Sequence, residues 1–254
     1  MKTLKIVVKG FFLVGILTFP NVLISATQNE DDWSQNNLEF SSYGVTQKRG
    51  ARGPHMPRMR FNDIGAVAEK EIKGFLKIKE KGYLNIVNPN GSIIIRGNAK
   101  ENSVKILVKV KDTTIEAAQK RLSTVQSKIN EKEGSTSIEV PYADRLEADI
   151  EVSLKFSAID LNIKQNNGKI EINDTSGDLK LNLTNGNTII KDSKIEDGTI
   201  DQNNGSIRVI FNDSYSGKLR AKLNNGSINV FLPKSSNCNV YLKSAHGQAK
   251  TDIE

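Results

Sequence analysis

The 254-residue chain is poor in the residue types on which most catalytic and metal sites depend. It has one cysteine and two histidines, which excludes an internal disulfide framework and a cysteine-rich zinc site. Aromatic residues make up 6% of the chain, and only one apolar run approaches membrane length, so a polytopic membrane protein is excluded. The hydrophobic fraction of 37% still allows a core, although it lies below the roughly 45–50% of an average globular protein.

The formal net charge of +7 would be compatible with nucleic-acid binding, but the charge is distributed unevenly along the chain. Residues 1–26 carry +3, residues 27–47 carry −4, residues 48–60 carry +5, and residues 61–254 carry only +3. A nucleic-acid-binding domain gathers lysine and arginine on one face, and no such concentration is evident after residue 61. We therefore expect a nearly neutral main domain and no nucleic-acid partner.

Residues 1–26 have the pattern of a secretory signal peptide. Three lysines precede an apolar stretch from Phe11 to Phe19, and the segment ends in the small residues Ser25 and Ala26. The stretch is short for a membrane span and is broken by Pro20, so export with cleavage after Ala26 is favoured over an uncleaved anchor. We expect no transmembrane span after cleavage and a location in the periplasm, at the cell surface or outside the cell.

Residues 27–71 are predicted to form a disordered polar and basic linker. They are polar at first and then rich in glycine, proline and arginine between Gln47 and Arg60. Such a composition cannot bury enough apolar surface to offset chain entropy. Its basic part could tether the chain to anionic polymers, but we favour the interpretation as a spacer, because short basic runs are common.

A patterned domain is predicted for residues 72–254. Its first part alternates apolar and polar residues, as strands do, in the pairs Leu76/Ile78, Leu84/Ile86 and Ile93/Ile95. One segment, at about 113–130, instead has apolar residues three and four positions apart, namely Ile115, Ala118, Leu122, Val125 and Ile129. Thr113 and Glu116 resemble a capping box at its start, and Gly134 marks a stop. We therefore expect a small β region that carries one amphipathic helix.

Repeat coils at about 160–250 are marked by two alternating classes of turn. The first class, which also occurs once upstream, comprises Asn90-Gly91, Asn167-Gly168, Asn185-Gly186, Asn204-Gly205 and Asn225-Gly226. The second class comprises Ser176-Gly177, Asp197-Gly198 and Ser216-Gly217, with His246-Gly247 closing the series. The last four glycines of the first class are 18, 19 and 21 residues apart. We assign all of these positions as structural turns, where glycine supplies a positive φ.

Apolar residues alternate after each Asn-Gly pair, as at Ile170 and Ile172, and this predicts strands with one inward face. Asn-Gly is a strong hairpin signal, so an antiparallel meander remains an alternative. Two turn classes at a period near 20 favour a single-stranded β-solenoid, in which each coil contributes two short strands and equivalent residues stack. The expected fold class is therefore all-β, with isoleucines stacked inside and asparagines stacked at the corners.

Residues 83–254 resemble the bacterial "putative adhesin" β-strand-repeat family, whose function is largely unassigned. The resemblance depends on the ordered combination of Gly82–Gly97, a helix-bearing segment, Asn167–Ile172, Ser176–Leu181, Asn204–Val209 and Asn225–Pro233. It implies an exported or membrane-tethered β-solenoid without catalytic residues to transfer. Two features depart from the family pattern: asparagine stands before glycine where many relatives have serine, and the coil 186–205 is irregular.

No combination of residues indicates catalysis, and we predict no catalytic, cofactor-binding or metal-binding residue. The densest acidic group, Asp192, Glu196 and Asp197, lies beside lysines and is interpreted as a solvated loop. Cys238 alternates with apolar residues and is expected to be buried, and His246 lies at a turn.

We accordingly expect an exported, non-enzymatic binding or scaffold module of the adhesin-like kind. Partners compatible with such a module are an envelope polymer, a surface protein or a second copy of the chain. The alternative is an envelope-stress or regulatory accessory protein, and a carbohydrate-active β-helix enzyme is the least favoured hypothesis.

Overall fold

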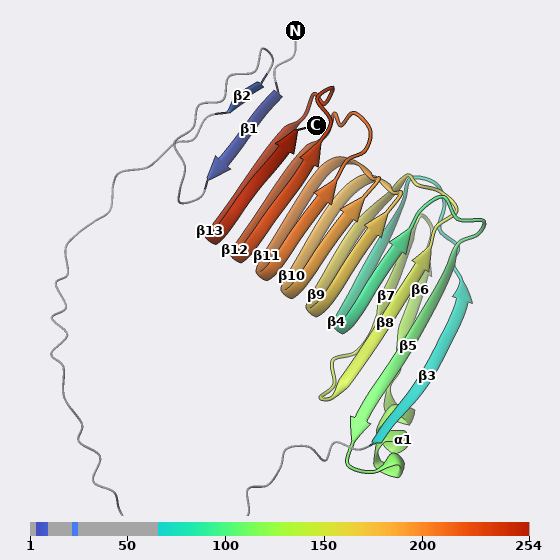
Figure 1. Ribbon diagram of the computed structural model, residues 1–254. Coiled ribbons are helices and arrows are strands. Elements are labelled where there is room, and N and C mark those ends of the chain that lie inside the picture. The colour runs from blue at the N-terminus through green and yellow to red at the C-terminus, as the bar shows by residue number, and fades with distance from the viewer. Residues whose placement is uncertain (1–3, 10–21, 25–65, 254) are drawn as a thin grey trace, which may run out of the picture.

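The computed structural model describes residues 4–9, 22–24 and 66–253, with side chains for the last range (Figure 1). These described residues form one open 13-stranded sheet with a single short helix, so the all-β prediction is confirmed. The sheet order along its length is β2-β1-β13-β12-β11-β10-β9-β4-β8-β5-β3, and β6 and β7 branch off at β4.

The repeat region consists of long parallel strands that stack in chain order. These strands are β9 (Ile159–Asn173), β10 (Ser176–Lys191), β11 (Lys194–Ile210), β12 (Lys218–Leu232) and β13 (Asn239–Ile253). The earlier strand β4 (Gly82–Arg96) pairs with β9 in the same way. Every neighbouring pair is parallel and aligns glycine with glycine, as in Gly186 with Gly205, so the meander alternative is wrong.

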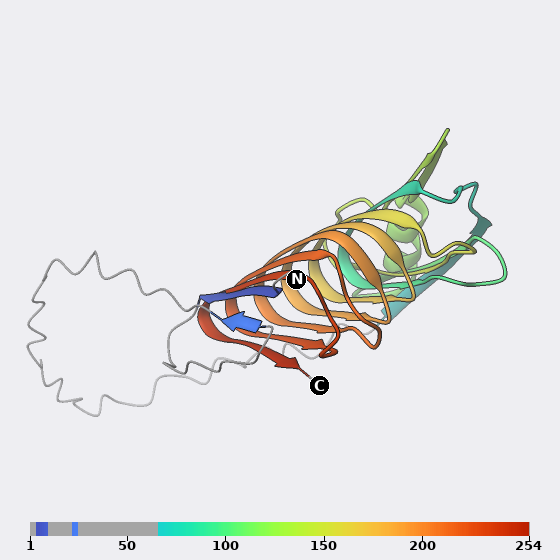
Figure 2. The same ribbon diagram turned by 90° about the horizontal axis from the view of Figure 1, so that it is seen from above.

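Each repeat strand doubles back at its Asn-Gly position, which divides it into a first and a second arm (Figures 1 and 2). In β13 the bend is at His246-Gly247, which aligns with Asn225-Gly226 and therefore belongs to the first class of turn, not to the second as predicted. The strand nevertheless continues through the bend, and the repeat strands are 15 to 17 residues long. The predicted arrangement of two short strands per coil is therefore not confirmed, because backbone pairing with the neighbouring repeats is maintained at the bend itself. The fold is solenoid-like, with one folded-over strand per repeat.

The core lies between the two arms. It is built from columns in which equivalent residues of successive repeats stack on one another. One column contains Ile93, Ile170, Ile207 and Ile228, all 0% exposed. Side chains alternate in and out along each arm, so every second residue enters such a column. Burial of each isoleucine contributes about 1.5–3 kcal/mol, which makes the columns the main source of stability of the stack.

The region before the repeats forms the other end of the sheet. It contains β3 (Ala66–Phe75), β5 (Ser103–Asp112), β6 (Lys128–Lys132), β7 (Ser135–Glu139) and β8 (Leu146–Ser153). β8 pairs in parallel with the second arm of β4 and β7 pairs in parallel with its first arm, whereas β3 and β5 continue from β8 as antiparallel strands. The transition from parallel to antiparallel pairing therefore occurs at β8 and β7, the strands that lie beside the two arms of β4.

The helix α1 (Ile115–Thr124) is shorter than the predicted range 113–130 and begins two residues later than expected. Its N-cap is Thr114, whose hydroxyl accepts a hydrogen bond from the Ala117 N–H at 3.2 Å, and not Thr113. It ends at Val125, which is extended. Ile129, assigned to the helix from its spacing, instead lies on β6, where the antiparallel ladder with β7 supplies its backbone hydrogen bonds.

Two further strands lie within residues 1–26. β1 (Leu4–Lys9) pairs in parallel with the first arm of β13, and β2 (Val22–Ile24) pairs in parallel with β1. The signal peptide remains a prediction, and most of the predicted linker lies outside the described residues. β3 begins at Ala66, ahead of the predicted start of the patterned domain at residue 72. No helix in the described part of the chain is long and apolar enough to cross a membrane.

Candidate functional site

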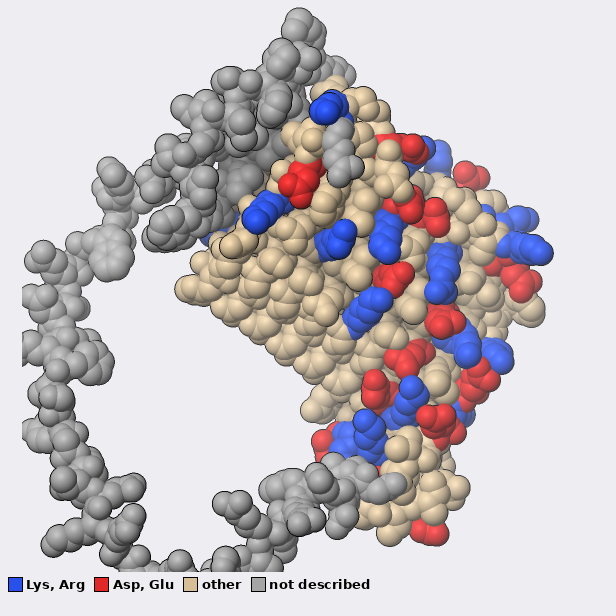
Figure 3. Space-filling model, viewed as in Figure 1, with Lys and Arg blue, Asp and Glu red and all other residues tan. Residues whose placement is uncertain are grey.

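The bends of the parallel strands bring five asparagines into one hydrogen-bonded row, which we call the amide ridge. Its residues are Asn90, Asn167, Asn185, Asn204 and Asn225. Each asparagine after the first donates from Nδ2 to Oδ1 of the preceding one, at 2.7 to 2.8 Å. Asn90 continues the chain by donating to the carbonyl oxygen of Leu146 at 3.2 Å. The ridge is a continuous uncharged edge of the molecule (Figure 3).

The ridge depends on the glycine that follows each asparagine. Gly205 has a φ of +118°, and a Cβ at this position would overlap the carbonyl oxygen of Gly186 in the adjacent repeat. Only glycine combines this φ with such a close approach of two backbones. The second class of turn is less uniform, because Gly177 has a positive φ whereas Gly198 and Gly217 do not.

Polar side chains beneath the ridge bind the bends from inside. Gln165 donates from Nε2 to the carbonyl oxygen of Gly91 at 2.5 Å, and Gln202 does the same to Gly186 at 2.8 Å. Gln202 Oε1 also accepts a hydrogen bond from the Thr188 hydroxyl at 2.9 Å, and both of these side chains are buried. These inward polar residues were not predicted from the sequence, although a polar residue at an inward position of the alternation is a signal for them.

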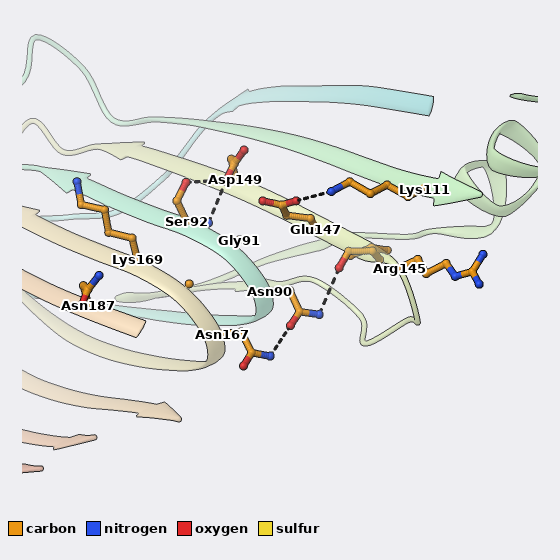
Figure 4. A pocket seen from close by; sticks show the side chains of 12 residues that line it. Asn90, Gly91, Ser92, Lys111, Arg145, Glu147, Asp149, Asn167, Lys169 and Asn187 are labelled. Atoms are coloured by element: carbon orange, nitrogen blue, oxygen red, sulfur yellow. Dashed lines mark hydrogen bonds and ion pairs between the residues drawn. The ribbon is translucent and has the colours of Figure 1, made fainter. Parts of the chain in front are cut away.

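A hollow of about 700 Å³ lies beside the first end of the ridge, where β8 passes the bends of β4 and β9 (Figure 4). Asn90, Gly91, Asn167 and Gly168, four of the predicted turn residues, line it. Its charged lining consists of Lys111, Arg145, Glu147, Asp149 and Lys169. The hollow is therefore polar and combines ridge amides with charges of both signs.

The carboxylates of this hollow are held by fixed partners. Asp149 accepts hydrogen bonds from the Ser92 N–H at 3.0 Å and hydroxyl at 2.7 Å, and it pairs with Lys109 at 3.0 Å. Burial by itself would raise the pKa of Asp149, but the hydrogen bonds from Ser92 and Lys109 outweigh it and lower that pKa below its ordinary value. Glu147 lies 3.8 Å from Lys111. The geometry therefore favours an ionised Asp149 with a structural role.

The remaining candidates from the sequence do not converge on a reactive centre. Cys238 is 3% exposed, and burial raises the pKa of its thiol to about 12, which keeps it protonated. His246 is exposed at the bend of β13, about 26 Å of extended strand away from Cys238. Within residues 66–253, no group of three or more His, Cys, Asp or Glu side chains is arranged to hold a metal ion.

The stacked, folded-over strands define the class of protein. The model of the family described as Toastrack DUF4097 matches residues 65–254, three quarters of the chain, and the chain belongs to this family. This confirms the resemblance seen in the sequence and extends it upstream from residue 83, to include β3. A search of curated proteins finds no match.

Several solved structures match most of the chain at low identity. A protein from Clostridium sporogenes, described as a putative cell adhesion protein, is 15% identical, with a TM-score of 0.45, over 74% of this chain and 100% of its own. A putative adhesin from Bacteroides fragilis is 10% identical, with a TM-score of 0.32, over 73% and 99%. A protein from Parabacteroides distasonis, described as a putative lipid binding protein, is 14% identical, with a TM-score of 0.30, over 73% and 97%. None of these likenesses assigns a ligand to this chain.

Proposed function

We propose that this protein is an exported, non-enzymatic module of the adhesin-like kind, which binds or scaffolds a hydroxyl-rich polymer of the cell envelope. The observation that carries the proposal is the amide ridge, a straight exposed row of hydrogen-bonding groups on a rigid stack. Successive amides stand at the strand spacing of about 4.8 Å. The ridge therefore presents a regular polar surface along the length of the repeat region.

The hydrogen bonds within the ridge leave binding capacity on its outer side. A primary amide has two N–H donors and two acceptor lone pairs, and an internal asparagine such as Asn185 uses one of each on its neighbours. One donor and one acceptor per repeat remain for the hydroxyl groups of a ligand. Because the amides are already fixed, binding does not have to order them, and this lowers its entropic cost.

The carboxylates beside the ridge favour binding over hydrolysis. A glycoside hydrolase needs one protonated carboxylic acid and a second carboxylate on opposite sides of the scissile bond. Asp149 has a lowered pKa and three hydrogen-bond donors around it, so it is unsuited to act as a general acid. Glu147 points to a lysine partner, and this further supports a binding role for the hollow.

Export can be tested by fractionating expressing cells and sequencing the N-terminus of the mature protein. The expected N-terminus is Thr27, with the protein in the envelope or the medium. An intact N-terminus together with a cytoplasmic location would contradict the export part of the proposal.

Binding can be tested by cosedimentation of the purified protein with peptidoglycan sacculi. The double variant Asn185→Ser/Asn204→Ser should weaken retention by about tenfold, because it removes two of the ordered amides. Asn229→Ser, on the second arm of β12, is the matched control and should bind like the wild type. Circular dichroism establishes that both variants are folded. Equal binding by both variants, or release of soluble sugar from the sacculi, would contradict the proposal.

A further inference from the structure

Charge is segregated along the stack although the domain as a whole is nearly neutral. Residues 159–201 contain eight acidic and five basic residues, whereas residues 218–253 contain six lysines and arginines and one acidic residue, Asp252. Because the strands stack in chain order, this difference in sequence becomes a difference in space. The last two repeat strands, β12 and β13, form a basic end of the stack.

Four of these cations share one surface, which we call the basic face. Lys218, Arg220 and Lys222 are exposed at alternate positions on the first arm of β12, while the leucine and alanine residues between them are buried. Lys243 is exposed on the first arm of β13 and stands directly beside Lys222 in the strand register. The basic face is thus a row of three cations along one strand with a fourth on the next strand.

The cations of the basic face lack ion-pair partners among the described residues. Asp197 and Asp201 occupy the register positions on β11 beside Lys218 and Lys222, but no carboxylate oxygen of the described residues lies within 4.0 Å of these four cations. Like charges on directly adjacent strand positions, such as Lys222 and Lys243, destabilise a sheet. A bound polyanion would remove this repulsion.

We propose that the basic face binds a linear acidic polysaccharide. The three cations on β12 are spaced by about 6.7 Å along an extended strand, and this suits a chain that carries repeating carboxylates. The row is narrow, since it spans two strands, and so it matches a linear polymer better than the broad anionic surface of a membrane. This surface differs from the amide ridge, and the inference goes beyond the function proposed for that ridge.

The aromatic residue of this surface supports a polysaccharide over a nucleic acid. The guanidinium of Arg220 lies 5.0 Å from the centre of the Tyr241 ring. Single-stranded nucleic acid binds to free aromatic faces on which its bases stack, and Arg220 covers a face of this ring. The phenol hydroxyl remains a donor and acceptor for sugar hydroxyls.

The strand β1 lies beside β13, but none of the four cations of the basic face comes from it. In the full chain its register places Lys5 beside Asn239 and Lys9 beside Lys243, which continues the basic columns by one strand. The basic face itself lies wholly within residues 218–243, so the proposed binding does not require residues 1–26.

The test measures binding of the purified protein to polygalacturonate, with neutral dextran as the reference polymer. The quadruple variant Lys218→Gln/Arg220→Gln/Lys222→Gln/Lys243→Gln should bind polygalacturonate at least about tenfold more weakly and with a smaller dependence on salt. The matched control replaces Lys70, Lys100, Lys120 and Lys128 by glutamine. These four residues are also exposed, lie in the region before the repeats, and change the net charge by the same amount.

The control variant should keep its affinity within about twofold of the wild type. An equal loss of affinity in both variants would show that binding depends only on net charge, and this would overturn the proposal. No loss of affinity in either variant would overturn it as well. Tighter binding to anionic vesicles or to a single-stranded oligonucleotide than to polygalacturonate would also overturn it. Retention on peptidoglycan sacculi without polygalacturonate binding would refute this inference and leave the proposed function intact, whereas loss of both would refute both.

Discussion

At the scale of single residues, neighbouring repeats can approach closely at the bends only because glycine has no side chain there. The carbonyl oxygen of Gly186 occupies the space in which a Cβ on Gly205 would lie. The adjacent Asn204 and Asn185 can form their hydrogen bond because the backbones lie this close. The two residues of each Asn-Gly pair therefore act together. The asparagine supplies the hydrogen-bonding amide, and the glycine lets the two backbones lie close enough for neighbouring amides to bond.

Gly205→Ala should lower the free energy of unfolding by at least about 3 kcal/mol, since it combines an unfavourable φ with overlap against backbone. Gly134→Ala is the matched control. Gly134 also has a positive φ, of +74°, but a Cβ there meets nothing within 4 Å, so the expected cost is about 1 kcal/mol. Urea denaturation followed by circular dichroism measures both values. A similar cost for the two variants would show that overlap between repeats contributes little.

The buried thiol of Cys238 predicts loss of stability at alkaline pH. Burial raises its pKa from an ordinary 9.0 to about 12, so between these values the unfolded chain releases the proton while the folded chain retains it. Its contribution is fully present below pH 9 and is lost as the pH rises toward 12, by up to about 1.4 kcal/mol per pH unit.

Denaturation at pH 8.5, 9.5 and 10.5 can test this dependence on Cys238. Cys238→Ala should be less stable at every pH but should lose less stability between pH 9.5 and 10.5 than the wild type. Parallel pH profiles of the two proteins would be inconsistent with a buried, protonated thiol.

At the scale of elements, β10 and β11 are joined by a buried polar contact as well as by their ladder. Thr188 stands in a column that isoleucines occupy on β4, β9, β11 and β12, and its hydroxyl donates to Gln202 on the next strand. Gln202 in turn donates to the carbonyl oxygen of Gly186. The two polar residues are therefore tolerated in the core because each satisfies the other.

The pair Thr188 and Gln202 should behave as one unit in a double-mutant cycle. Gln202→Leu should cost about 2 kcal/mol, because it leaves the Thr188 hydroxyl buried without a partner. Thr188→Val should cost a similar amount, and the double variant should cost less than the sum of the single variants by about 1 kcal/mol or more. Chemical denaturation of the four proteins measures the coupling. Additive costs would show that the hydrogen bond contributes nothing.

At the scale of the whole molecule, the stack is built from units that contact mainly their neighbours. Gly186 and Gly205 occupy equivalent positions, so deletion of residues 187–205 joins the first arm of β10 to the second arm of β11 and removes one repeat. The deletion also removes Thr188 and Gln202 together and leaves neither without its partner. The shortened protein should fold, with a stack about 4.8 Å shorter by small-angle X-ray scattering.

Deletion of residues 187–200 is the out-of-register control for the repeat deletion. It would place Asn204 at the inward position of Ile190, where a polar side chain lacks a partner. This variant should not give the β-sheet circular dichroism spectrum of the parent. If both deletions folded equally well, the register of the columns would not be essential to the fold.

The sequence by itself determined the period, the inward and outward faces and the residues at the bends. Alternation at Ile170 and Ile172 gave the buried face, and the Asn-Gly pairs gave the positions where each strand folds over. These features are local, because they follow from side-chain alternation and from the φ that glycine allows.

Only the tertiary structure decided which elements pair with one another and which side chains they bring together on one surface. It ended α1 before Ile129, because pairing with β7 drew that segment into β6. It also continued each strand through its bend, because the neighbouring repeats supply backbone partners there. The near-neutral charge of the domain concealed the basic face, since Lys222 and Lys243 lie far apart in sequence and become neighbours only through the register of parallel strands.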